Sequence, residues 1–286
     1  MRFSNNELST NFLSMDDIKR MCPAAFKEVP TNPNVSDKYV QANTATVISD
    51  LEKLGWRPVE AKQCKPKKNS SGIRSFHMVA FQNPDIYIEK PNPDGGSTID
   101  AYPRIILTNS HDGFNSFKFM VGLFRLVCSN GLVVATEEFA NMAIRHINYD
   151  FETLRDVVKT TIDEIPNIVC KMNEMKKTIL TEDEKKEIAA SVVKIRKNIP
   201  DDEKFDIDEE TVMNILQPNR DEDKGDDLWT VFNICQEKMI KGGFSAMNAS
   251  NKTRKQRSIS SIKKDVDYNQ KLWAVASRFM PATVAA

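Results

Sequence analysis

The chain has 286 residues, 40% of them hydrophobic and 28% charged, so it can bury an ordinary core without a disulfide framework. Lys plus Arg and Asp plus Glu number 40 each, and this balance excludes the basic excess of a generic nucleic-acid coat protein. Five scattered cysteines with no C-x-x-C pair fit a reducing compartment. The N-terminus lacks an apolar signal core, and no run of about 18 apolar residues occurs, so we expect a cytoplasmic protein with no membrane partner.

Residues 1–41 are polar and irregular, which predicts an N-terminal arm with one short helix at Met15–Met21 capped by Ser14. Thr44–Leu54 carries apolar residues at helical spacing, with Asn43 or Thr44 as its cap and Gly55 at its end. Turn sequences then separate β-prone segments. These predict strands at Arg57–Cys64, Ser75–Phe81, Arg104–Asn109 and Phe117–Cys128, the last with a bulge at Gly122. Residues 42–150 are therefore expected to form an α+β core.

Residues 151–250 have a helical period and predict a helical region. Phe151–Met175 is expected to kink or restart at Pro166. Thr181 and Glu184 form a capping-box pattern that opens a helix to about Lys197. Residues 201–227 hold twelve acidic and three basic side chains. Further helices are expected at Asp227–Lys241, ended by Gly242–Gly243, and at Asn269–Met280 within a final segment, 251–286.

The predicted fold class is α+β. An antiparallel meander of about four or five strands packs on helices, and a mostly helical C-terminal region follows. No internal repeat is found.

Motifs for catalysis are absent from the sequence: there is no P-loop, no G-x-G-x-x-G after a strand, no H-E-x-x-H and no G-x-S-x-G. His111 and Asp112 could form a dyad, but their place at an Asp112–Gly113 hairpin turn predicts solvated side chains instead. Glu137–Glu138 could bind a metal, although a helix N-terminus explains them more simply. We therefore expect no enzyme, cofactor or metal site. A metal site assembled from scattered carboxylates stays open.

A basic hairpin is the first feature that can carry function. Lysines and an arginine flank the predicted turn between two strands: Lys62, Lys65, Lys67, Lys68 and Arg74. Such a hairpin can lie along a phosphate backbone and release counterions, with Phe76 and His77 beside it to stack on bases. The alternative is a solvated loop whose lysines only aid solubility.

A second basic feature is the stretch 251–264, which holds six basic side chains and no acidic one. Arginine, lysine and hydroxyl groups suit phosphate contacts, and the candidates are Arg254, Lys255, Arg257, Lys263 and Lys264, with Lys252 beside them. A flexible tail that neutralises the acidic residues 201–227 is the competing interpretation. The acidic segment could also mimic nucleic acid.

Phe117–Val134 is the third feature, and its aromatic residues Phe117, Phe119 and Phe124 are expected to lie in the core. Arg125 breaks the apolar pattern. It either faces a nucleic-acid groove or is a strand-edge charge that blocks aggregation.

Two stretches resemble a phage- and plasmid-borne family catalogued as domain of unknown function 932. One is Phe124–Leu132 (FRLVCSNGL), with Arg125, Cys128, Asn130 and Gly131 at the family's R-x-x-C-x-N-G positions. The other is the basic stretch from Arg254, followed by Asn269, Leu272 and Trp273. The resemblance spans roughly residues 40–280, and it implies a gene on a mobile element and a protein in the host cytoplasm. The family name assigns no activity.

The order of helix, β-meander and helix is also similar to the core of single-strand annealing proteins, which are oligomeric. From these features together we expect a non-enzymatic protein that binds single-stranded nucleic acid and takes part in strand annealing, with homo-oligomers left open. The alternatives are a protein–protein module that inhibits a host protein and a virion-associated structural protein.

Overall fold

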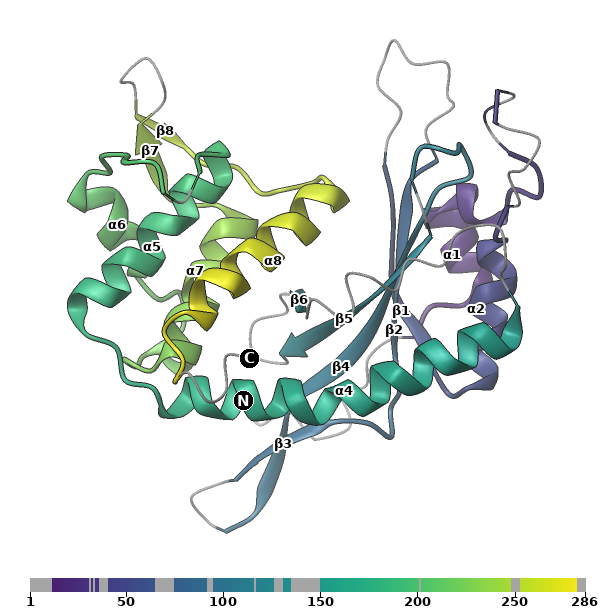
Figure 1. Ribbon diagram of the computed structural model, residues 1–286, viewed down its shortest axis with the longest axis horizontal. Coiled ribbons are helices and arrows are strands. Elements are labelled where there is room, and N and C mark those ends of the chain that lie inside the picture. Colours follow the sequence, from purple (N-terminus) through teal and green to yellow (C-terminus); the bar gives the residue numbers. More distant parts are fainter. Residues whose placement is uncertain are drawn as a thin grey trace. The chain divides into compact units, whose positions relative to one another are not determined.

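The computed structural model describes residues 12–30, 32, 34–35, 41–64, 75–91, 95–115, 117–125, 131–134, 150–200, 202–247 and 253–281. The chain folds into two compact units, an N-terminal unit (Met1–Glu164) and a C-terminal unit (Ile165–Ala286). The first is built around an antiparallel sheet and the second around packed helices, as the predicted α+β class requires (Figure 1).

Six strands form the sheet of the N-terminal unit, in the order β1-β2-β4-β5-β6, with β3 paired to β4. The elements are α1 (Met15–Met21), η1 (Pro23–Phe26), α2 (Thr44–Lys53), β1 (Arg57–Gln63), β2 (His77–Gln82), β3 (Ile88–Pro91), β4 (Ser97–Asn109), β5 (Lys118–Arg125), β6 (Gly131–Val134) and the first part of α4 (Phe151–Lys177). Ala101 of β4 pairs with both Ile88 and Arg125, so β3 continues the edge that β2 occupies further along β4.

One face of the sheet is the core of this unit. Ala61, Val79, Leu107 and Phe119 are successive cross-strand neighbours, all at most 3% exposed. They pack in one cluster with Ile18 of α1, Val47, Ile48 and Leu51 of α2, and Leu154, Val157 and Val158 of α4. Phe117 and Phe119 lie in this core, as predicted, whereas the side chain of Phe124 is outside the described residues. Burying this alternating face is what fixes the strand register.

The bulge expected at Gly122 is wrong. The β4–β5 register runs evenly from Ala101↔Arg125 to Thr108↔Lys118, with Gly122 directly opposite Arg104. Arg104 is 6% exposed, and Glu60 lies 3.8 Å from its guanidinium. Burial lowers the pKa of Arg104 to about 10, although Glu60 opposes the shift. Gly122, which has no side chain, thus faces the large buried side chain of Arg104. This close packing explains the glycine, and no bulge is needed.

Helix α7 (Leu228–Lys241) is the centre of the C-terminal unit. Every residue from Leu228 to Met239 is buried, as expected of a helix enclosed on all sides. It contacts α5 (Glu182–Lys197), α6 (Glu209–Leu216), η2 (Asp221–Asp223) and α8 (Ile262–Ser277). The unit also contains the rest of α4, β7 (Ser245–Met247) and β8 (Thr253–Lys255). Trp229 stacks on Phe232 within α7, and Phe232 meets Trp273 of α8 edge to face.

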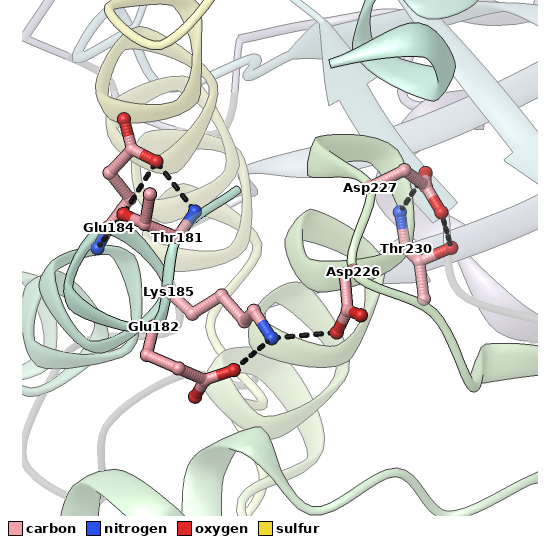
Figure 2. A network of polar contacts seen from close by, with 7 residues as sticks. All are labelled: Thr181, Glu182, Glu184, Lys185, Asp226, Asp227 and Thr230. Atoms are coloured by element: carbon pink, nitrogen blue, oxygen red, sulfur yellow. Dashed lines mark hydrogen bonds and ion pairs between the residues drawn. The ribbon is translucent and has the colours of Figure 1, made fainter. Parts of the chain in front are cut away.

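Local hydrogen bonds define where these helices begin (Figure 2). The predicted capping box is confirmed, because Thr181 Oγ1 accepts from Glu184 N–H and Glu184 accepts from Thr181 N–H at 2.7 Å. Asp227 caps α7 by accepting from Thr230 N–H at 3.0 Å and from its hydroxyl at 2.7 Å. Lys185 bridges Glu182 and Asp226, each at 2.6 Å, and so ties the start of α5 to the segment before α7.

Helix α4 runs through Pro166 without ending, so of the kink or restart expected there, the restart is wrong. The boundary between the units, at Glu164 and Ile165, falls inside the same helix. The expected boundary at residue 150 coincides with the start of α4, where Asp150 accepts from Thr153 N–H at 2.7 Å.

Replacing Asp227 by Ala should destabilise the C-terminal unit by about 1 kcal/mol, because α7 loses its N-cap. Asp227→Asn is the matched control, since Asn caps helices as well as Asp does and should cost less than about 0.5 kcal/mol. Urea unfolding followed by tryptophan fluorescence measures both. Equal losses in the two variants would mean that the carboxylate charge, not the cap, matters here.

Candidate nucleic-acid interface

The predicted contact residues are divided between the two units. Arg254, Lys255, Arg257, Lys263 and Lys264 belong to the C-terminal unit, whereas Lys62 lies in β1 of the N-terminal unit. The hairpin residues Lys65, Lys67, Lys68 and Arg74 are outside the described residues, as are Lys252 and Glu137–Glu138. Arg125 ends β5 opposite Ala101, and its side chain is likewise not described.

Lys62 is paired within its own strand. Its ammonium lies 2.5 Å from Glu60, with both side chains partly exposed. A phosphate would have to displace this carboxylate, so Lys62 is a weaker candidate than the sequence indicated.

The five cations of the C-terminal unit form what we call the basic strip: Arg254, Lys255, Arg257, Lys263 and Lys264, all exposed. Strand β8 pairs with β7, which places Arg254 opposite Ala246 and Lys255 opposite Ser245. Beyond β8 the backbone is held to the end of α7. Gln256 N–H donates to Phe244 O at 2.7 Å, Gly243 N–H to Gln256 O at 3.0 Å, and Ile259 N–H to Ile240 O at 2.8 Å. The described part of this stretch is therefore not the flexible tail of the alternative interpretation.

Arg196 of α5 binds the backbone of the basic strip. Its guanidinium donates to Arg257 O at 2.7 Å and to Met239 O, and it lies over the Phe244 ring. Burial lowers the pKa of Arg196. The Arg257 backbone is thus bound by a half-buried cation, which leaves the Arg257 side chain exposed.

The last two cations of the strip open a helix. α8 begins at Ile262, seven residues before the predicted Asn269, because Ser261 caps it by accepting from Lys264 N–H at 3.4 Å. Lys263 and Lys264 therefore stand in its first turn, at the positive end of the helix dipole. Each like charge there costs roughly 0.3–1 kcal/mol. An anion bound at this place would relieve that repulsion.

Acidic side chains of the segment 201–227 cap helices and form ion pairs within the C-terminal unit. Asp208 caps α6 and Asp227 caps α7. Other carboxylates pair with Lys and Arg: Glu209 with Lys186, Asp226 with Lys185, Asp223 with Arg220 and Asp221 with Lys224. Capping and pairing explain these acidic side chains without a mimic of nucleic acid.

The chain matches a known protein family. A family model described as Domain of unknown function (DUF932) matches residues 33–273. The chain belongs to the DUF932 family. The match confirms the resemblance expected from the sequence, and its range contains both the basic strip and the whole described sheet.

Two curated relatives of similar identity to this chain come from Escherichia coli (strain K12). UPF0380 protein YafZ is 29% identical over 277 residues, and UPF0380 protein YfjQ is 28% identical over 277 residues. In both cases the alignment covers 94% of this chain and 92% of the relative. No solved structure matches the chain.

This DUF932 chain also contains a buried polar cluster that the sequence did not predict. His111 and Asp112 are 0% and 1% exposed, so the expectation of solvated side chains is wrong. Within the described residues 110–115, Gly113 and Phe114 are the exposed ones. Asp112 accepts from Ser75 N–H at 3.1 Å and from Phe114 N–H at 3.0 Å, which draws the β4–β5 turn against the start of β2.

His77 lies in the same cluster, with its ring 5.2 Å from that of His111. Ser75 O is only an acceptor and lies 2.6 Å from His77 Nδ1, so the proton is on Nδ1. His77 Nε2 then accepts from the Thr44 hydroxyl at 2.8 Å. Because Thr44 has donated its single proton, His111 Nε2 at 3.2 Å must donate to it. Ser75 O therefore sets the tautomer of His77, and the Thr44 hydroxyl between the two rings sets that of His111.

The described residues of this family member contain no group of three His, Cys, Asp or Glu side chains that could hold a metal ion. Across the same residues, no helix has the length and apolar character needed to cross a membrane.

Acidification should weaken the DUF932 fold through His77. Burial lowers its pKa from 6.5 to about 4, although Ser75 and Asp112 oppose the shift. The unfolded chain therefore binds a proton first. Stability is lost as the pH falls from about 6.5 to about 4, by roughly 3 kcal/mol in all.

His77→Asn keeps an N–H donor for Ser75 O but cannot titrate. It should be less stable than wild type at neutral pH and should lose less stability on acidification. Urea midpoints measured across this pH range give the two slopes, and parallel slopes would show that His77 is not the group responsible.

Proposed function

We propose that this DUF932 protein binds single-stranded nucleic acid and catalyses no reaction on it. The observation that carries the proposal is the basic strip. Its five exposed cations stand on a backbone held by hydrogen bonds to β7, α7 and Arg196.

A fixed row of cations suits phosphates for two reasons. Each contact releases condensed counterions, which supplies affinity that does not depend on sequence. The backbone is already ordered, so binding costs less conformational entropy than a loose tail would. The zero net charge of the chain does not oppose this, because the acidic residues of 202–227 named above are engaged in caps and ion pairs.

The choice of single strands, and of strand annealing in replication or recombination, comes from the similarity in element order to annealing proteins. No solved structure matches the chain, so this part of the proposal rests on that similarity alone. It includes an oligomeric form and the host cytoplasm of a phage or mobile element. An acidic segment such as 201–227 would favour the alternative, a host-protein partner. Its internal contacts leave the basic strip as the stronger observation.

Replacing three strip residues together, Arg254→Ala, Lys255→Ala and Arg257→Ala, should weaken binding and flatten its salt dependence. Each phosphate contact contributes about 0.7 to the slope of log affinity against log salt on single strands, so the slope should fall by about 2. Fluorescence anisotropy with labelled oligothymidylate across a salt series measures this.

The matched control removes three other surface charges of the same unit, Lys177→Ala, Lys186→Ala and Lys224→Ala. Each of these lysines is ion-paired. Their loss should leave affinity and slope close to wild type. If both triple variants weaken binding alike, overall charge is responsible and the strip is not a site.

A further inference from the structure

A groove lies between the C-terminal end of α5 and the last turns of α8, entirely within the C-terminal unit. Its volume is about 550 Å³, within the range of small-molecule sites. Ile195 and Val275 are 7% and 6% exposed. The described lining residues are Lys194, Ile195, Asn198, Ile199, Pro200, Lys271, Ala274, Val275 and Arg278.

The groove is apolar inside and cationic around it. Lys194, Lys271 and Arg278 contribute positive charge, and none of the lining residues that the structure describes is acidic. Two carboxylates stand nearby. Asp267 pairs with Lys271 at 2.9 Å, and Glu187 lines a smaller adjoining hollow. The Lys271 and Asp267 side chains are 43% and 49% exposed, so solvent screens their pair and an incoming anion can compete with it.

The cations of α8 link this groove to the basic strip. Lys264, Lys271 and Arg278 follow one another at intervals of seven residues, which keeps them near one helix face. Successive members are separated by roughly 10 Å along the axis. Arg278 retains helical geometry, with φ −68° and ψ −22°. A chain of phosphates that leaves the strip at Lys264 can therefore continue along α8 to the groove.

We propose that the groove holds one nucleobase of the bound strand, with the flanking phosphates on Lys271 and Arg278. This deepens the proposed function and rests on it. A base inserts between apolar side chains, here those of Ile195, Ile199 and Val275. Asn198 at the rim brings an amide that can pair with a base edge. A base in a duplex is stacked and paired and cannot enter without flipping out, so the groove gives a physical reason for single-strand preference.

The test compares oligothymidylate with an abasic strand of the same length and phosphate charge, using the full chain. Wild type should bind the base-bearing strand more tightly, by roughly five- to 100-fold. Ala274→Gln, a neutral change that fills the groove with a polar side chain, should bring this ratio close to one and leave affinity for the abasic strand unchanged. Met213→Gln is the control, because Met213 is 50% exposed on α6 and does not line the groove.

The outcomes separate the inference from the proposal beneath it. Equal wild-type affinity for both strands, or a ratio that Ala274→Gln leaves intact, overturns the base site and leaves the phosphate strip standing. Binding of neither strand overturns both.

Asp267→Asn should raise the affinity for either strand by roughly two- to five-fold, because it removes the carboxylate that competes for Lys271. The same anisotropy titration measures it. Unchanged or weaker binding would show that Lys271 does not contact phosphate.

Discussion

The exposed charges of the C-terminal unit depend on one close approach of backbone to backbone at the end of α7. Gly242 has φ +72°, and a Cβ built on it would lie 2.4 Å from Gln256 O. Any side chain there would collide with the backbone of Gln256 and Arg257, directly after β8. A residue with no side chain and free access to positive φ is therefore required at this position. The position of the basic strip therefore depends on the buried α7 and on the glycine that ends it.

The N-terminal unit depends in a comparable way on a hydrogen-bond network among buried polar side chains. Thr44, His77, Asn109 and His111 are completely buried, and none can reach water. Asn109 donates to Ala42 O at 3.0 Å and to Thr44 Oγ1 at 2.9 Å. Such a network stabilises only when every donor has its acceptor. It joins the start of α2, the start of β2 and the end of β4.

Features set by neighbouring residues were predictable from the sequence. Ser14, Asn43, Thr181 and Asp227 cap helices because each needs only backbone groups two or three residues away. Helix α6 was missed, since Val212 and Ile215 are its few apolar contacts in a segment dominated by acids. Strand β4 was predicted only from Arg104, whereas it begins at Ser97. Pro103 interrupts the strand pattern in the sequence. In the sheet it pairs with Leu123 of β5 on one side, and on the other side it lies at the break between β2 and β3.

The candidate site was predictable only in part, for the same reason. The basic composition of 251–264 identified the strip, but the groove draws on α5 and α8, about 75 residues apart in sequence. The polar cluster joins residues 44, 77 and 111 through pairings of distant strands, and no local pattern encodes these. Antiparallel pairing of Ser75–Phe81 with Arg104–Asn109 was the one available signal, because it brings their ends together.

The continuous α4 has a consequence for how the chain can be divided. Leu154, Val157 and Val158 belong to the core of one unit, while the buried Ile168, Met172 and Met175 lie on the stretch assigned to the other. No linker separates them, so a cut at the boundary would sever a helix and leave each half with a frayed end. The two units therefore share one helix, and unfolding of either unit would shorten it.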